Sequence, residues 1–80
     1  MNNSEAVEIL ANEADTSERL AIQHCNRGDH RQAAWRFEKA GDYYRQADMF
    51  EAAARCYAQA YLEARWVRPV TPTNVSGLVD

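Results

Sequence analysis

Four side chains are the His and Cys residues that could ligate a soft metal ion such as zinc: His24, Cys25, His30 and Cys56. Zinc prefers four such ligands in a tetrahedral arrangement, commonly supplied by Cys-x-x-Cys or His-x-x-x-His spacings. Neither spacing occurs among these four, and the adjacent His24 and Cys25 point about 100° apart on a helix. We therefore predict no metal site, and we expect Cys25 and Cys56 to be small apolar packing residues.

The residues that could support catalysis do not form a recognisable catalytic motif in the sequence. Nucleophilic catalysis needs a Ser or Cys within hydrogen-bond reach of an activating base. Because Cys25 follows His24 directly, that pair has poor geometry for such a bond. Gly28, Gly41 and Gly77 stand alone, so they do not form a glycine-rich phosphate loop. We predict a protein that is not an enzyme and has no cofactor.

Aromatic and basic side chains in the middle of the chain are the stronger candidates for binding. Aromatic residues and Arg are favoured at the hot spots of protein interfaces. The candidate partner-binding residues are Trp35, Tyr43, Arg31, Arg36, Lys39 and Arg45. The alternative is that Trp35 packs internally, against the N-terminal part of the first predicted helix or against Trp66, or that it packs in a dimer.

A repeat of small and aromatic residues indicates the elements that position these side chains. Ala33, Ala34, Phe37 and Ala40 recur twenty residues later as Ala53, Ala54, Tyr57 and Ala60. Small residues let two helices approach closely, and an aromatic residue three or four positions away lies on the same face. A repeated unit of this kind is typical of stacked helices.

Capping and stop signals divide the chain into three predicted helices, at about residues 4–27, 30–47 and 49–66. Gly28 ends the first helix, and Asp29 and Asp48 cap the next two. The stripe expected to be buried in the second helix is Ala33, Phe37, Ala40 and Tyr44. The matching stripe in the third helix is Ala53, Tyr57, Ala60 and Ala64, with Phe50 at its start.

These elements predict an all-α fold, an antiparallel array of three helices with the second helix in the centre. Residues 1–66 are predicted to form one helical domain. In residues 67–80, Pro, Thr, Val, Ser and Gly replace Ala and charged residues. We expect this segment to be a flexible or extended tail. The alternative is that it docks on a helix or adds a strand to a partner.

The order of residues between positions 17 and 64 carries a family resemblance. A large and a small residue precede a Gly-Asp turn, and a small–aromatic–small helix follows. The residues that carry this order are Leu20-Ala21, His24, Gly28-Asp29-His30, Ala33, Phe37 and Ala40. They resemble a tetratricopeptide repeat, and the shifted second copy would make about one and a half compressed repeats. The resemblance implies helical hairpins and protein binding.

A second, weaker resemblance rests on the same turn and the helix after it. Its residues are Gly28-Asp29-His30, Ala33-Ala34, Phe37 and Ala40. They are similar to the AraC-negative-regulator (ANR) family of small bacterial regulators. This resemblance implies a bacterial transcriptional regulator that acts through a protein partner or by binding DNA.

Length and charge limit the remaining function classes. A formal net charge of −3 argues against general affinity for nucleic acid. No apolar run approaches the roughly 20 residues that cross a bilayer, and two cysteines make no disulfide framework. We expect a cytoplasmic protein. Because so short a chain buries little surface, we also expect a homodimer. The predicted function is a non-catalytic protein–protein interaction module, a small regulatory or adaptor/inhibitor protein.

Overall fold

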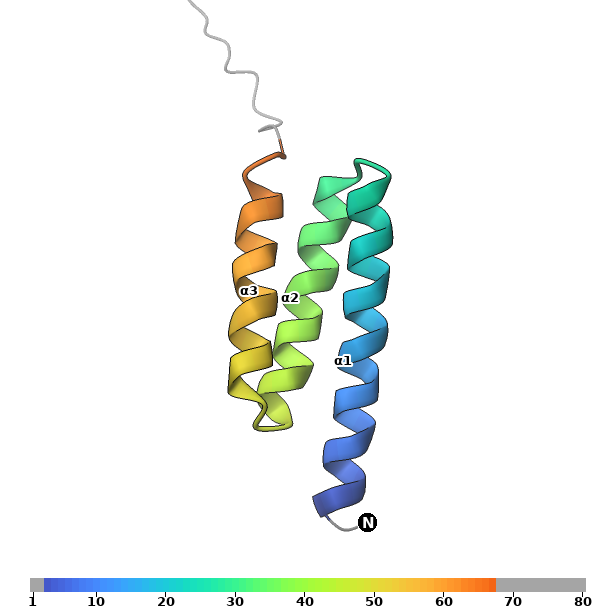
Figure 1. Ribbon diagram of the computed structural model, residues 1–80, viewed down its shortest axis with the longest axis vertical. Coiled ribbons are helices and arrows are strands. Elements are labelled where there is room, and N and C mark those ends of the chain that lie inside the picture. The colour runs from blue at the N-terminus through green and yellow to red at the C-terminus, as the bar shows by residue number, and fades with distance from the viewer. Residues whose placement is uncertain (1–2, 68–80) are drawn as a thin grey trace, which may run out of the picture.

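Three antiparallel helices make up the fold, with the second helix between the other two (Figure 1). The computed structural model describes residues 3–67. The helices are α1 (Asn3–Asn26), α2 (His30–Gln46) and α3 (Phe50–Ala64). The predicted all-α array is confirmed, and the helix ends lie within two residues of their predicted positions. Except for Val67, the predicted tail lies outside the described residues.

The two turns between the helices share one backbone geometry. Gly28 has φ +81° and Asp48 has φ +62°, so both occupy the left-handed region. The next amide in each turn, of Asp29 or Met49, donates to a carbonyl five residues back at 2.8 Å. This bond pattern satisfies carbonyl groups that the end of a helix leaves open. The twenty-residue repeat therefore extends into the turns.

Of the two helix caps predicted for α2 and α3, one is confirmed. Asp29 caps α2 by accepting a hydrogen bond from the Gln32 amide at 3.3 Å. The prediction that Asp48 caps α3 is wrong, because Asp48 occupies the position equivalent to Gly28. The capping position is taken by Met49, which has no side-chain acceptor to offer. An aspartate tolerates the left-handed conformation better than most residues do, which explains Asp48 at this turn.

The buried stripe of α2 is confirmed: Ala33, Phe37, Ala40 and Tyr44 are all buried. A core cluster joins Ala40 and Tyr44 of α2 to Ala14 of α1 and to Ala53 and Cys56 of α3. One stripe of α2 therefore faces into the junction of all three helices.

The predicted stripe of α3 is wrong in part. Ala53, Cys56 and Glu63 are the buried positions, whereas Ala64 and Phe50 are exposed. Tyr57 and Ala60 are half-buried. The helix is rotated so that Cys56 and Glu63 point inward and Tyr57 lies at the edge of the contact with α2.

Gly41 permits that edge contact. A Cβ atom at this position would lie 2.7 Å from Cε1 of Tyr57, too close for a side chain. The Tyr57 hydroxyl donates to Oδ1 of Asp42 at 2.5 Å, which holds the ring over the glycine. Among the described residues, no helix combines the length and the apolar character needed to cross a membrane.

Candidate functional site

The predicted partner-binding residues fall into two groups in the structure. Trp35 lies on the side of α2 opposite its buried stripe, and 46% of it is exposed. The Arg36 guanidinium carbon lies 4.9 Å from the centre of the Trp35 ring, and Nζ of Lys39 lies 5.5 Å from it. Arg31 borders the same shallow depression as Trp35. We call Arg31, Trp35, Arg36 and Lys39 the Trp35 surface.

The other two predicted residues lie apart from this surface. Tyr43 is half-buried and packs against the core cluster. Arg45 lies near Asp42, with an Nη2–Oδ1 distance of 3.9 Å. Trp66 was considered above as an internal packing partner of Trp35. In the structure Trp66 stacks on His30, with 5.8 Å between the ring centres.

Cations over an aromatic face are attracted by the ring quadrupole. The Trp35 surface thus combines a large apolar contact area with positive charge on a chain whose net charge is negative. Nε of Arg36 is buried and has no hydrogen-bond partner among residues 3–67.

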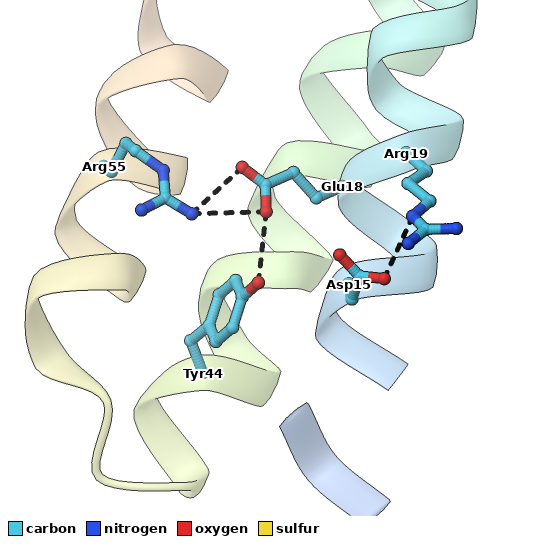
Figure 2. A network of polar contacts seen from close by, with 5 residues as sticks. All are labelled: Asp15, Glu18, Arg19, Tyr44 and Arg55. Atoms are coloured by element: carbon cyan, nitrogen blue, oxygen red, sulfur yellow. Dashed lines mark hydrogen bonds and ion pairs between the residues drawn. The ribbon is translucent and has the colours of Figure 1, made fainter. Parts of the chain in front are cut away.

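A polar network joins α1 to α3 across the buried stripe of α2 (Figure 2). Glu18 of α1 accepts two hydrogen bonds from Nη2 of Arg55 in α3, at 3.1 and 3.3 Å. The Tyr44 hydroxyl of α2 donates to the same carboxylate at 3.1 Å. Burial, and then this hydrogen bond, raise the pKa of Tyr44. The network connects the two outer helices.

A second polar cluster joins all three helices near the other end of the array. The Cys25 thiol of α1 donates to Oε2 of Glu63 at 3.2 Å. Nδ1 of His30, at the start of α2, lies 2.6 Å from Oε1 of the same carboxylate. Glu63 itself is 7% exposed. The hydrogen bond to Glu63 is the main cause that raises the pKa of Cys25.

The order of the thiol, carboxylate and imidazole in this cluster disfavours Cys25 as a nucleophile. In a Cys–His–carboxylate triad, the imidazole stands between the thiol and the carboxylate and removes the thiol proton. Here Glu63 stands between Cys25 and His30, and its negative charge opposes formation of the thiolate. The arrangement is better suited to sharing protons or a cation than to attack on a substrate.

Sequence reasoning identifies two members of the cluster and misses the third. Of the four soft residues singled out, only Cys25 and His30 come together. Cys56 is fully buried in the core cluster as expected, but Cys25, for which the same was expected, is half-buried and donates to Glu63. Glu63 is the missed residue. An available signal was its spacing from Ala53, Cys56 and Ala60, which places an acidic residue on an otherwise apolar stripe.

Among known proteins, no protein-family model, curated protein or solved structure matches this chain. The two family resemblances therefore rest on their residues alone.

Proposed function

We propose that this chain is a non-catalytic protein–protein interaction module, a small regulatory or adaptor/inhibitor protein. The observation that carries the proposal is a second apolar stripe on α3, which none of the described helices covers. The stripe consists of Phe50, Ala54, Ala58 and Tyr61, all of them exposed. Phe50 is 61% exposed and Tyr61 is 68% exposed. These two rings point within about 20° of each other around the helix axis.

The composition of this outer stripe resembles that of the internal helix contacts. α2 packs against a neighbour on each side, and its buried stripe combines alanine with aromatic residues. α3 has the same kind of side chains on two faces, but within the described residues only the face towards α2 and the core cluster is covered. Alanine in the middle of the outer stripe would let another helix approach closely, with an aromatic ring at each end of the contact.

The occupant that fits the outer stripe best is a second copy of the chain. Its order is aromatic, alanine, alanine, aromatic, so it reads the same in both directions. In an antiparallel pair with two-fold symmetry, Phe50 would lie near Tyr61 of the second copy, and Ala54 near Ala58. A self-complementary surface is what such symmetry requires. A second copy would also add the buried area that a small domain lacks.

Self-association is tested by light scattering coupled to size-exclusion chromatography over a hundredfold concentration range. We expect a dimer whose population rises with concentration, because one helix per protomer makes a small contact. Tyr61→Arg places two charges in that contact and should yield a monomer. The matched control Trp35→Arg changes an exposed aromatic residue on another helix and should dimerise normally. A wild-type monomer throughout the range would contradict the homodimer.

The Trp35 surface remains free in such a dimer, and we assign it to a segment of a different protein that brings an apolar side chain to Trp35 and single carboxylates to the basic residues. Trp35→Ala should remove a hot-spot side chain and weaken this complex by about thirtyfold. Co-purification with tagged chain would identify the candidate partner. Titration calorimetry with both purified proteins would then measure the affinity, which should fall as salt increases because the attraction is partly ionic. Equal affinity of Trp35→Ala and wild type for the partner would exclude this surface as the binding site.

Direct reading of DNA is the less favoured alternative. Glu38 and Asp42 are interleaved with the basic residues of α2. Arg45 lies near Asp42, and Arg36 is half-buried beside Trp35. A recognition helix needs basic and amide side chains together on one accessible face.

A further inference from the structure

Three potential metal ligands from different parts of the chain meet near the turn between α1 and α2. Sγ of Cys25, Nδ1 of His30 and a carboxylate oxygen of Glu63 all lie within 4.8 Å of one another. We propose that Cys25, His30 and Glu63 bind one Zn²⁺ ion, with water in the fourth coordination position. The site is independent of the outer stripe and of the Trp35 surface.

The spacing of the three ligand atoms suits a zinc ion. Zinc binds sulfur at about 2.3 Å and nitrogen or oxygen at about 2.0–2.2 Å, so tetrahedral ligand atoms stand about 3.3–3.8 Å apart. The Cys25 Sγ–Glu63 Oε2 distance is 3.2 Å and the His30 Nδ1–Glu63 Oε1 distance is 2.6 Å. These two contacts use different oxygens of Glu63, and each is shorter than the spacing in a zinc site because a hydrogen bond joins its atoms. Displacing the bonding protons and separating the atoms by roughly 0.3–0.7 Å would make room for the ion.

The chemical types of the three ligands favour some metal ions over others. One thiolate, one imidazole and one carboxylate form a mixed sulfur, nitrogen and oxygen set that suits zinc. Magnesium and calcium prefer oxygen ligands alone, which makes them poor candidates here. Zinc also accepts three protein ligands together with water.

The burial of Glu63 is a second observation that favours a cation. Its side chain is only 9% exposed, and its two oxygens face the thiol and the imidazole. Burying a carboxylate is costly unless charge or strong hydrogen bonds compensate. Cys25 and His30 supply two such bonds, and a divalent ion that replaced the bonding protons would supply charge instead.

The surroundings of His30 restrict the movement of its ring. The His30 ring lies against Trp66 at an angle of 28° between the planes. The residue begins α2, directly after the Asp29 cap, so its backbone is fixed by the turn. The ion would therefore join the end of α1, the start of α2 and the end of α3.

Cobalt and zinc titrations of the untagged full chain test the site. The protein is first stripped with a chelator and then kept reduced by a phosphine, so that both thiols stay free. We expect one Co²⁺ per chain, with a cobalt–thiolate charge-transfer band in the near ultraviolet and the visible bands of four-coordinate cobalt. Zinc should abolish these bands by displacement. At free zinc one hundred times its dissociation constant, the melting temperature should rise by about 10–20 °C.

Matched variants assign the ligands. Cys25→Ser and Glu63→Gln should weaken cobalt binding by tenfold or more and remove or alter the bands. Controls are Cys56→Ala, which removes the other thiol, and His24→Gln, which removes the other histidine. Both controls should bind as wild type does, with circular dichroism confirming that every variant is helical. Absence of a charge-transfer band in wild type, or its persistence in Cys25→Ser, would overturn the proposal.

Discussion

Replacing Phe37 with alanine is expected to unfold the helical array at room temperature. Phe37 is 5% exposed and lies on the buried stripe of the central helix. Truncating a buried phenylalanine costs about 3–5 kcal/mol, because apolar contacts are lost and a cavity remains. A domain of this size rarely has more than about 3–5 kcal/mol of stability to lose. Far-ultraviolet circular dichroism during urea titration would show the wild-type transition and little or no folded baseline for the variant.

The chain supplies its own control, because its second phenylalanine is exposed. Phe50 is 61% exposed on the outer stripe of α3. In dilute solution, where no second copy covers it, Phe50→Ala should change the free energy of unfolding by at most about 0.5 kcal/mol. Equal destabilisation by the two substitutions would contradict the orientation of α2 or of α3.

The two helices differ in how far sequence could predict their buried faces. α2 has one stripe of alanine and aromatic residues at helical spacing, and the structure buries that stripe. α3 carries apolar residues on two faces, one that includes Ala53 and Cys56 and another that includes Phe50 and Tyr61. Periodicity shows that both faces exist, but it cannot show which one contacts α2. The predicted stripe took residues from each face and was therefore partly wrong.

The two candidate sites also differ in how far the sequence could predict them, because one is local in sequence and the other is not. Trp35, Arg36 and Lys39 are near one another along a single helix, so local geometry was enough to group them. Glu63 lies 38 residues from Cys25 and 33 from His30. That association depends on how the end of α3 returns to the turn between α1 and α2. Spacing along the chain places Glu63 on the apolar stripe of α3, but it does not show that Glu63 meets Cys25 and His30.

Alkaline pH is expected to destabilise the fold through groups that are buried in the neutral state. Burial is the main cause that raises the pKa of Cys56 from 9.0 to about 11. In the unfolded chain this thiol loses its proton near pH 9, while the folded protein still holds it. Stability is thus fully present below pH 9 and falls as pH rises towards 11, by about 2 kcal/mol. Urea midpoints measured at intervals from pH 8 to pH 11 would show the decline.

Cys56→Ala separates this thiol from the other groups that titrate in the same range. Burial raises the pKa of Tyr44, and a hydrogen bond to Asp42 raises that of Tyr57, so both act in the same direction at higher pH. The variant should lose some stability at pH 8, because a small cavity replaces the sulfur. Its stability should then fall less steeply than that of wild type between pH 9 and pH 11. Identical slopes would assign the alkaline loss to the tyrosines or to Cys25, and would contradict the burial of Cys56 against α2.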